Sequence, residues 1–377
     1  MVSGPPIRVL QLLVSTALGG GPTQVFETLR RLSRKEFDWV IGAPADGPFF
    51  QRFAELGPVH ELPLHRLSAR TLLDVVRLLR TERIDVVHSH GKGAGLYGRL
   101  AAGLTRTSAV HTFHGIHADK YGPVGRAAYV ALERCLSALS YAVVNVSARQ
   151  AQTGDALRLW PRGRAMLIVN GIDAEQTRAL ARTGQRTDFG VGPRGQVIAY
   201  IARLDAVKAV EVFLDASARL LERHPDLRAV LIGGGPEERR LRDRVARAGA
   251  ERAMVFAGEM PDAARVFAIA DVYVSTSRGE GLPLSLLEAM ACGVPVVASR
   301  IAAHEELITD GRTGLLARLD DPGDVAKKID RVLGDQDLGR RLGAAARDVV
   351  ERRYDVERTA ETLAELYRRA GEAARSA

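Results

Sequence analysis

Short apolar runs rich in β-branched residues alternate along the whole chain with stretches of amphipathic helical periodicity, such as residues 25–32 and 71–79. This alternation is the pattern of parallel βαβ units, in which helices cover both faces of a sheet. The sequence therefore predicts the α/β class. Strands are expected at residues 7–14, 37–43, 59–62, 86–88, 109–114, 142–146 and 165–169, and then at 197–202, 229–232, 254–256, 272–275, 295–298 and 314–316.

A chain of 377 residues is longer than a single hydrophobic core usually serves, so two domains are expected. A polar segment without periodicity at 181–193 indicates a linker between them. The predicted organisation is two doubly wound, Rossmann-like domains, residues 1–180 and 193–350. A charged amphipathic helix follows at 351–377.

The chain is basic, with 53 Lys and Arg against 45 Asp and Glu and a net charge of +8. Such a charge can reflect affinity for nucleic acid, anionic lipid or phosphorylated ligands. Only six of the basic residues are lysines, however, and a GC-rich genome gives any protein this Arg-rich, Ala-rich composition. We favour the compositional explanation and expect no nucleic-acid partner.

Targeting signals are not evident. The first residues lack the basic segment and apolar core of a signal peptide, and no stretch reaches the roughly 18–20 apolar residues that span a bilayer. Cys135 and Cys292 show no metal or redox spacing, which indicates buried side chains of a reduced compartment. We therefore expect a cytoplasmic chain.

One segment suggests peripheral contact with a membrane. Residues 119–139 carry Lys120, Arg126 and Arg134 among tyrosine, valine and leucine residues. Weak binding to an anionic membrane is therefore one hypothesis, and it would put the protein on the inner face of the plasma membrane. The alternative is that this helix only packs against the first sheet.

Three glycines, Gly19, Gly20 and Gly21, follow the first strand and precede a helix whose start is marked by Pro22 and Thr23. Glycines there allow backbone amides to approach a phosphate or a sugar, and the following helix N-terminus favours negative charge. A simple turn is the alternative. The spacing is not that of a dinucleotide-binding fingerprint, which disfavours an NAD-dependent reductase.

A short helix is expected over residues 283–291, because Pro283 suits a first helical turn and Gly293 suits the left-handed position just past the end. Its N-terminus would present free backbone N–H groups, from Leu284 and Ser285 among others, to an anion beside the glycine loop at 279–281.

Two carboxylates flank that helix N-terminus. Glu288 lies about 7–8 Å inside the helix at about 1.5 Å per residue, so it could reach a ribose when a diphosphate sits at the tip. Glu280, in the loop, could reach a sugar beyond the phosphate. A solvated Glu288 is the alternative, but its neighbours are apolar, so a buried carboxylate there would need a partner.

Arg203 and Lys208 follow the first strand of the second half, at the edge where open α/β sheets bind ligands. Two cations are what a leaving diphosphate needs as negative charge builds on it. Plain surface charge is the alternative. A further polar group consists of histidines near strand ends, which we interpret as lining a cleft rather than binding a metal: His88, His90, His111, His114 and His117.

Together these residues resemble the retaining glycosyltransferases of family 4, which have the GT-B fold. The resemblance runs from about residue 9 to 367. It is carried by the glycines at 19–21, Val-His-Ser-His at 87–90, Thr-Phe-His-Gly at 112–115, Asn-Gly-Ile-Asp at 170–173, Arg203 with Lys208, the stretch 233–236, Glu280 with Glu288, and 295–298. The segment 90–100 is similar to enzymes of bacterial capsule or exopolysaccharide assembly. Ala209 and Tyr141 depart from the family pattern, where a glycine and an acidic residue are common.

The resemblance implies two domains that face each other across a cleft and a C-terminal helix that crosses back to the first domain. It implies that Arg203 and Lys208 hold the donor diphosphate, Glu280 the sugar and Glu288 the ribose, and that His114 contacts the sugar at the anomeric centre. The stretch near Glu259 and Met260 would meet the base. Further donor-binding residues would be Gly20, Gly21, Gly281, Leu282, Pro283 and Leu284.

The predicted reaction is transfer of a sugar from a nucleoside diphosphate donor to an acceptor hydroxyl with retention of configuration, in cell-surface polysaccharide or glycolipid assembly. We expect no cofactor and no metal, because Arg203 and Lys208 can neutralise the diphosphate. The acceptor would be polyprenyl-linked, a lipid or a small molecule. The rival hypothesis is a catalytically silent sugar-nucleotide-binding paralogue that acts as a partner subunit; intact Arg203, Lys208, Glu280 and Glu288 argue against it.

Overall fold

A computed structural model describes residues 5–116, 118 and 121–376. His117, Asp119 and Lys120, which the sequence analysis singled out, lie outside the described residues. The chain forms two units. Unit 1 combines the chain up to Gly171 with Val356 onward, and unit 2 is Ile172–Asp355.

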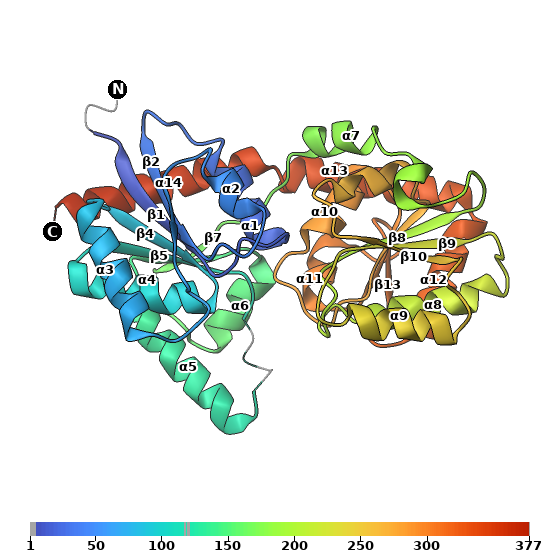
Figure 1. Ribbon diagram of the computed structural model, residues 1–377, viewed down its shortest axis with the longest axis horizontal. Helices are drawn as coiled ribbons and strands as arrows, with labels where there is room; N and C mark the ends of the chain where they lie inside the picture. Colours follow the sequence, from blue (N-terminus) through green and yellow to red (C-terminus); the bar gives the residue numbers. More distant parts are fainter. Residues whose placement is uncertain (1–4, 117, 119–120, 377) are drawn as a thin grey trace. The chain divides into compact units, whose positions relative to one another are not determined.

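Unit 1 is built on a parallel sheet with the strand order β3-β2-β1-β4-β5-β6-β7 (Figure 1). The order reverses between β1 and β4, which is the doubly wound arrangement expected from the sequence. The strands are β1 (Ile7–Leu13), β2 (Phe37–Ala43), β3 (Val59–Glu61), β4 (Val86–His90), β5 (Ser108–Phe113), β6 (Ala142–Asn145) and β7 (Ala165–Leu167).

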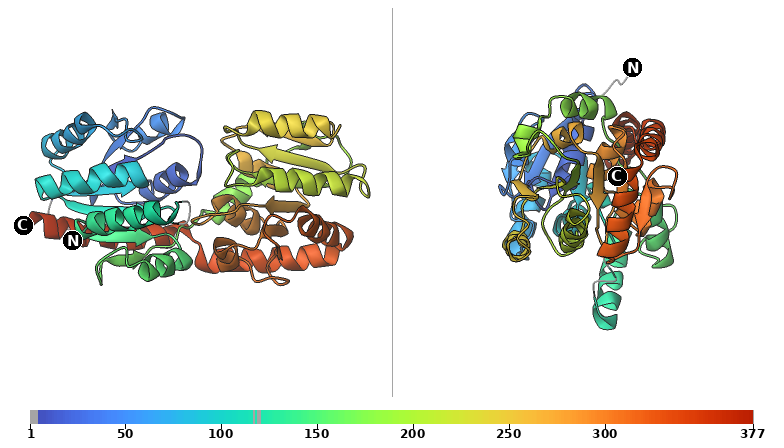
Figure 2. Two further views of the ribbon diagram at one scale, coloured as in Figure 1. Left: turned by 90° about the horizontal axis from the view of Figure 1, so that it is seen from below. Right: turned by 90° about the vertical axis from the view of Figure 1, so that its right-hand side faces the viewer.

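Helices cover both faces of this sheet, and Figure 2 shows the two layers from a second side. Because side chains alternate along a strand, Val9 and Leu13 of β1 pack with α1 and α14, whereas Leu10 and Leu12 pack with α3 and α4. The helices are α1 (Gly20–Leu29), α2 (Phe49–Phe53), α3 (Ala69–Thr81), α4 (Lys92–Thr105), α5 (Pro123–Ala138), α6 (Ala148–Ala156) and α14 (Val356–Arg375).

The C-terminal helix α14 belongs to unit 1, although unit 2 precedes it in the chain. It packs on β1, β4, β5 and α1 (Figure 1). Tyr367 is fully buried there among Phe37 and Trp39, and Thr359 Oγ1 donates to the Val169 carbonyl at 2.8 Å. The apolar face of this amphipathic helix therefore packs into the core of unit 1.

Unit 2 repeats the architecture, with the parallel order β10-β9-β8-β11-β12-β13. Its strands are β8 (Val197–Ile201), β9 (Arg228–Ile232), β10 (Met254–Gly258), β11 (Val272–Ser275), β12 (Val296–Ser299) and β13 (Leu315–Ala317). Its helices are α7 (Ala174–Ala181), η2 (Arg186–Phe189), α8 (Val210–Leu221), α9 (Glu238–Arg247), η3 (Ala263–Ala268), α10 (Leu284–Ala291), α11 (Ala302–Leu307), α12 (Pro322–Gly334) and α13 (Gln336–Arg353).

Every strand expected from the sequence is present in the described chain, with ends that differ by at most two residues. The first helix differs more. It begins at Gly20 rather than at residue 25, because the Thr23 amide already bonds to the Gly19 carbonyl and Pro22 is tolerated in a first turn.

The segment at 181–193 is not a linker but part of unit 2. The Asp173 side chain caps α7 by accepting from the Gln176 amide at 2.8 Å, and Phe189 of η2 is buried. The chain leaves unit 1 at Gly171 and returns to it at Val356.

Helix α5 projects from the body of unit 1 (Figure 1). Residues 123–128 are exposed, and the buried residues begin at the middle of the helix, at Tyr129, Glu133, Leu136 and Ser137. In the described part of the chain, no helix is both long enough and apolar enough to cross a membrane.

Candidate functional site

The strand order of unit 2 reverses between β8 and β11, which pair through Ile198 with Val272 and Ala199 with Tyr273. Open α/β sheets bind ligands outside the carboxyl ends of the strands at this reversal. The loop after β8 carries Arg203 and Lys208, and the loop after β11 carries Glu280. The topology therefore brings these sequence-predicted loops to one edge.

Lys208 and Glu280 form an ion pair at this edge. Lys208 Nζ lies 2.6 Å from Glu280 Oε1 and 2.8 Å from Oε2, and the Ser277 hydroxyl donates to Oε1 at 2.6 Å. The Lys208 and Glu280 side chains are 24% and 11% exposed. The pair is thus shielded but reachable, and Ser277, which the sequence analysis missed, fixes the carboxylate.

The loop that carries Lys208 is held by neighbouring side chains. Asp205 Oδ1 accepts from the amides of Val207 and Lys208 at 3.0 and 3.2 Å. The Arg278 guanidinium donates to the Ala206 carbonyl at 2.9 Å, and the Arg278 amide donates to the Val207 carbonyl at 2.8 Å. These bonds fix the backbone on which the ammonium is mounted.

Ala209 adopts a left-handed conformation, with φ +48° and ψ +43°, and is completely buried. A left-handed residue other than glycine costs about 1–2 kcal/mol. The Tyr200 hydroxyl donates to the Lys208 carbonyl at 2.6 Å and the Thr276 hydroxyl to the Ala209 carbonyl at 2.9 Å, which holds the turn. The loop therefore has the shape for which a glycine is suited, although it carries alanine.

Arg203 occupies a different environment. Its side chain is 65% exposed and pairs with Asp205. The structure therefore places Arg203 on the same loop as Lys208 but gives the two cations different carboxylate partners.

Helix α10 begins at Leu284 after the N-cap residue Pro283, and no side chain caps its N-terminus. Gly293 has φ +71°, the left-handed position expected after the helix. Leu282, Pro283 and Leu284 are buried, so the backbone of this end is held firmly while Gly281 is half-exposed. The N–H groups and the dipole at this end favour an anion.

Glu288 is half-buried on α10. Burial and the Glu288 carboxylate together raise the pKa of the Cys292 thiol to about 12. Met260 is half-buried after β10, and the Glu259 side chain lies over Gly234, where a Cβ would meet Glu259 Oε1 at 2.8 Å. Both predicted base-contacting residues thus follow the strand at the sheet edge.

In unit 1 the glycine loop follows β1. A Cβ at Gly19 or Gly21 would meet nothing within 4 Å, so packing does not require glycine at either position. Gly20 is the first residue of α1 and is exposed. The loop is anchored by Asp46, whose carboxylate accepts from the Thr16 amide at 2.6 Å and from the Ser15 hydroxyl at 2.8 Å.

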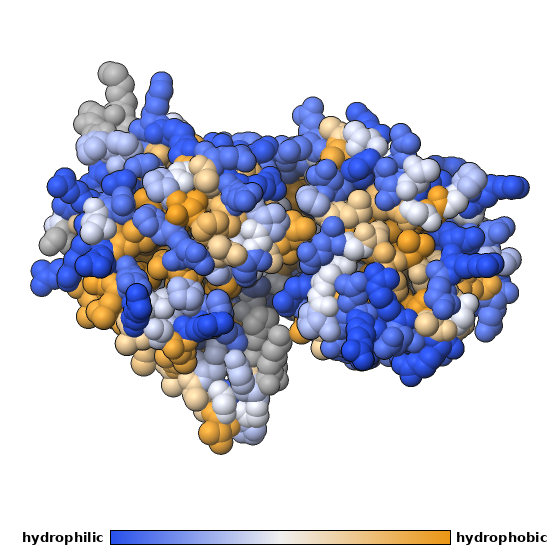
Figure 3. All heavy atoms as spheres, viewed as in Figure 1, coloured by the Kyte–Doolittle hydropathy of each residue, from blue (hydrophilic) through white to orange (hydrophobic). Residues whose placement is uncertain are grey.

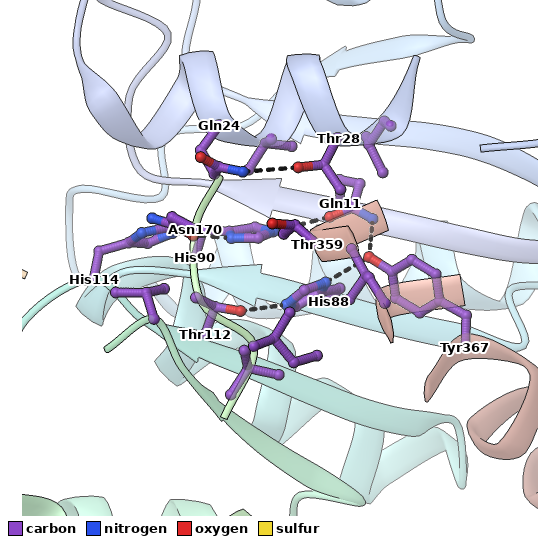
Figure 4. A pocket seen from close by; sticks show the side chains of 16 residues that line it. Gln11, Gln24, Thr28, His88, His90, Thr112, His114, Asn170, Thr359 and Tyr367 are labelled. Carbon is purple, nitrogen blue, oxygen red and sulfur yellow. Dashed lines mark hydrogen bonds between the residues drawn. The ribbon is translucent and has the colours of Figure 1, made fainter. Parts of the chain in front are cut away.

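Hydrogen bonds link six side chains near the carboxyl edge of the unit 1 sheet (Figure 4). We call them the histidine chain: His114, His90, Gln11, Tyr367, His88 and Thr112. In this order the five links measure 3.1, 2.9, 2.8, 2.6 and 2.7 Å. The chain starts at the predicted catalytic residue and ends inside the core.

Burial keeps these rings neutral. It lowers the pKa of His88 to about 3 and that of His114 to about 4, and it holds the pKa of His90 well below its usual range. His114 is half-buried, whereas His88 and His90 are 1% and 8% exposed. A cavity of about 40 Å³ adjoins the chain, which is room for a few water molecules and not for a sugar.

His111 is separate from this chain. It points to the opposite face, where its Nδ1 lies 2.9 Å from the Ser89 hydroxyl. Burial holds its pKa well below the usual range, and the nearby Arg99 guanidinium adds to that effect. It is therefore a core residue and does not line the cavity beside His114.

The described residues contain no group of three or more His, Cys, Asp or Glu side chains arranged to hold a metal ion. The sequence does contain one Asp-x-Asp triplet, at 335–337. Asp335 caps α13 by accepting from the Leu338 amide at 2.8 Å, and Asp337 pairs with Arg340.

The sequence matches models of two glycosyltransferase domains, one in each half. A model described as Glycosyltransferase Family 4 matches residues 18–176, and one described as Glycosyl transferases group 1 matches residues 182–349. A D-inositol 3-phosphate glycosyltransferase of Geodermatophilus obscurus is 30% identical over 348 residues, 85% of this chain and 76% of that protein. The chain belongs to glycosyltransferase family 4. A Bacillus subtilis protein named as the glycosyltransferase EpsD is 28% identical over 345 residues, 88% of this chain and 90% of its own.

Solved structures agree on the fold of this family 4 glycosyltransferase. Anabaena Alr3699/HepE, in complex with UDP and glucose, matches with a TM-score of 0.82 and 22% identity over 96% of this chain and 99% of that chain. Sucrose-phosphate synthase of Thermosynechococcus elongatus matches with a TM-score of 0.81 and 21% identity over 96% and 98% of the two chains. The two Rossmann-like units therefore form the GT-B fold.

Several residues of the site were missed by sequence reasoning. Asp46 bonds to Thr16, which lies 30 residues earlier in the chain, and no local signal marks such a contact. Asp205 and Ser277 bond to residues two or three positions along their own loops, but a polar residue near a strand end does not by itself reveal such a bond. Gln11 did leave a signal, because it is a buried amide in the middle of an otherwise apolar stretch of β1.

Proposed function

We propose that this glycosyltransferase moves a sugar from a nucleoside diphosphate sugar to an acceptor hydroxyl with retention of configuration. The observation that carries the proposal is the Lys208–Glu280 pair at the β8/β11 reversal, beside the uncapped N-terminus of α10. A diphosphate needs a cation and free backbone N–H groups, and this edge offers both. The binding of UDP-glucose by Anabaena Alr3699/HepE supports a UDP-sugar as donor.

In the proposed complex, the diphosphate binds the Lys208 ammonium in place of the Glu280 carboxylate, and it also binds the backbone N–H groups at the N-terminus of α10. Arg203, which is exposed and adjacent, adds a second cation. The Glu280 carboxylate, still held by Ser277, is then available to the sugar hydroxyls. Glu288 binds the ribose and Met260 lies at the base. In unit 1, Gly20, Gly21 and His114 are proposed to contact the phosphate and the sugar; a Cβ at Gly21 would meet nothing within 4 Å.

For the chemical step we propose a front-side reaction, in which the departing phosphate helps to deprotonate the acceptor. A double displacement needs a free carboxylate nucleophile. Glu280 is a poor candidate because, in the proposed complex, its carboxylate still accepts from Ser277 and also accepts from the sugar hydroxyls, which lowers its nucleophilicity. Lys208, Arg203 and the helix N-terminus supply positive charge where the leaving group gains negative charge, so no metal is required in this mechanism.

The proposed acceptor is a lipid-linked molecule at an anionic, cytoplasmic membrane surface, as in cell-surface polysaccharide or glycolipid assembly. Helix α5 supports this. Val124, Leu132 and Leu139 lie along one face and are 85%, 49% and 44% exposed, and Figure 3 shows apolar residues over its projecting end. The single acidic residue of α5, Glu133, is buried against Arg99 at 2.9 Å, whereas Arg126 and Arg134 are exposed. A helix that carries exposed apolar residues and exposed cations, with its one carboxylate buried, suits an anionic interface.

A thermal-shift screen of UDP, GDP and ADP sugars tests the donor class. A donor at about 100 times its dissociation constant should add roughly 2.7 kcal/mol to the free energy of unfolding. NMR of the anomeric proton of the product then tests retention. A silent paralogue would bind a donor but neither hydrolyse it nor transfer its sugar, and an inverted product would overturn the front-side mechanism.

A further inference from the structure

The histidine chain has a direction, because each neutral imidazole offers one hydrogen-bond donor and one acceptor. Once the proton on one ring nitrogen is assigned, the role of the other nitrogen follows. In a chain of linked neutral rings, one fixed member therefore sets all the others. Gln11 is that member, since its amide has a donor end and an acceptor end.

The Gln11 amide points its nitrogen at the Tyr367 hydroxyl and its oxygen at His90. Because the Gln11 oxygen can only accept, His90 must donate from Nε2. The Nδ1 of His90 is then bare and accepts from Nε2–H of His114 across 3.1 Å. The proton of His114 is thereby on Nε2, and its Nδ1 carries a lone pair.

The other branch of the chain is consistent with this direction. Since the Tyr367 oxygen accepts from Gln11, its hydrogen is free to donate to His88 Nδ1 at 2.6 Å. His88 then donates from Nε2 to the Thr112 hydroxyl at 2.7 Å. Reversing one link would require turning the Gln11 amide and changing the tautomer of all three rings together.

We propose that Gln11, His90 and Tyr367 are positioning residues that hold His114 as the Nε2–H tautomer, so that His114 Nδ1 accepts a hydrogen bond from a hydroxyl of the bound substrate. The two nitrogens point to different sides of the ring, and Nδ1 of His114 has no hydrogen-bond partner among the described residues. The half-buried ring is the end of the chain nearest the surface of unit 1. This inference rests on the proposed function for the identity of the ligand, but not for the tautomer.

The direction of the chain has a consequence for specificity. A lone pair on His114 selects a hydroxyl, which can donate, over an ether or fluorine at the same place, which can only accept. The C-terminal helix takes part in this choice, because Tyr367 is the residue of α14 that orients Gln11.

Tyr367→Phe is the informative variant, because phenylalanine keeps the packing and removes only the hydroxyl. Gln11 must then leave one end unpaired. An unpaired buried carbonyl is tolerated better than an unpaired N–H, so the amide should turn its nitrogen toward His90. The whole branch then reverses, and His114 becomes the Nδ1–H tautomer.

Ser89→Ala is the matched control. It removes a buried hydroxyl that contacts a histidine, His111, from the same strand as His88, but it leaves the histidine chain intact. Both variants should lose similar stability in thermal melts.

The measurement is two-bond ¹⁵N–¹H NMR of protein labelled at histidine, at pH 7 and without substrate, with the His114 signals assigned by a His114→Gln variant. We expect the Nε2–H form in the unsubstituted protein and in Ser89→Ala, and a shift to the Nδ1–H form in Tyr367→Phe. With the donor found by thermal shift, kcat/KM should fall about fivefold to tenfold only in Tyr367→Phe, the loss of one hydrogen bond.

An Nδ1–H tautomer in the unsubstituted protein would overturn the proposal, and so would an unchanged His114 signal in Tyr367→Phe. Either result leaves the proposed function intact, because the NMR readout needs no substrate. Conversely, absence of sugar transfer together with the expected NMR shifts would count against the proposed function alone.

Discussion

Lys208 and Arg203 carry the same charge on one loop, but their surroundings differ, so we expect them to contribute differently to sugar transfer. Lys208 is mostly buried and paired with Glu280, whereas Arg203 is 65% exposed and its interactions are screened by solvent. Lys208→Ala should therefore slow transfer on the order of a hundredfold, the scale of losing one charge-stabilising group, and Arg203→Ala should slow it less. Steady-state kinetics check this, with exposed Lys327→Ala as the control. Normal rates in both site variants would contradict the diphosphate assignment.

Glu280→Gln separates the two proposed ligands of this edge. The Glu280 carboxylate competes with a diphosphate for the Lys208 ammonium, since both carboxylate oxygens lie within 2.8 Å of Lys208 Nζ. The amide should therefore bind UDP as well as or better than the unsubstituted protein, while transfer from the sugar nucleotide falls on the order of a hundredfold.

Calorimetric titration with UDP and kinetics with the sugar nucleotide measure the two effects of Glu280→Gln. Glu305→Gln, which alters a carboxylate paired with Arg300, is the control and should change neither quantity. A loss of UDP affinity in Glu280→Gln with unchanged turnover would show that the carboxylate does not contact the sugar.

At the residue scale, the sequence could predict those site residues that lie beside a recognisable local pattern. Pro283 and Gly293 mark a helix, and Glu280 lies in the loop before it, so this carboxylate could be found. Ser277 and Asp205 could not, because a hydroxyl or carboxylate near a strand end looks the same in the sequence whether or not its own loop folds so that it bonds to a residue two or three positions away. The family resemblance flagged Ala209, and the left-handed φ of +48° explains why glycine is common there.

At the scale of elements, period and length fixed the strands, because buried parallel strands are short apolar runs with clear ends. The start of helix α1 was predicted too late because consecutive glycines are typical of a loop, yet Gly20 and Gly21 lie in the first turn of this helix. The linker prediction failed for a different reason: low periodicity at 181–193 concealed η2, which has a single buried residue, Phe189. Short elements with one buried residue carry little periodic signal.

Helix α5 is the element whose role depends on its unpacked face. If Val124 and Leu132 insert into a membrane, replacing both with Gln should weaken binding to anionic vesicles about tenfold or more, since each buried aliphatic side chain contributes about 1.5–3 kcal/mol. Cosedimentation with anionic and neutral vesicles at low and high salt measures this. Binding should fall with salt, because the attraction of Arg126 and Arg134 is screened within about 8 Å.

Leu73→Gln is the control for the α5 substitutions. Leu73 is 66% exposed on α3, another helix of unit 1, so its replacement lowers surface hydrophobicity without touching α5. Equal, negligible binding of the unsubstituted protein to both kinds of vesicle would leave a soluble acceptor as the remaining hypothesis.

At the scale of the whole molecule, the buried histidines divide unequally between the two units. Unit 1 holds His88, His90, His111 and His114 with lowered pKa values, and in unit 2 the pKa of His304 is lowered by burial. A histidine with a folded pKa below its unfolded value of about 6.5 gains its proton first in the unfolded chain, so acid favours unfolding. The stability that these groups contribute is present above pH 6.5 and is lost as the pH falls toward 4.

Each such group costs the folded state about 1.4 kcal/mol for every pH unit in that window. At pH 5.5, His88 and His114 together therefore cost unit 1 about 3 kcal/mol, a large part of the stability of an ordinary domain, and His90 and His111 add to this cost. In unit 2, only His304 among the histidines with a lowered pKa adds a cost of this kind. Carboxylates with lowered pKa values, such as Asp46 and Asp330, change the stability of the fold only below about pH 4.

We therefore expect unit 1 to lose protection from hydrogen exchange at a higher pH than unit 2. Hydrogen exchange resolved by peptide, corrected for the intrinsic rate at each pH from 7 to 4, measures the order. Simultaneous loss in both units would mean that the histidines do not control acid unfolding.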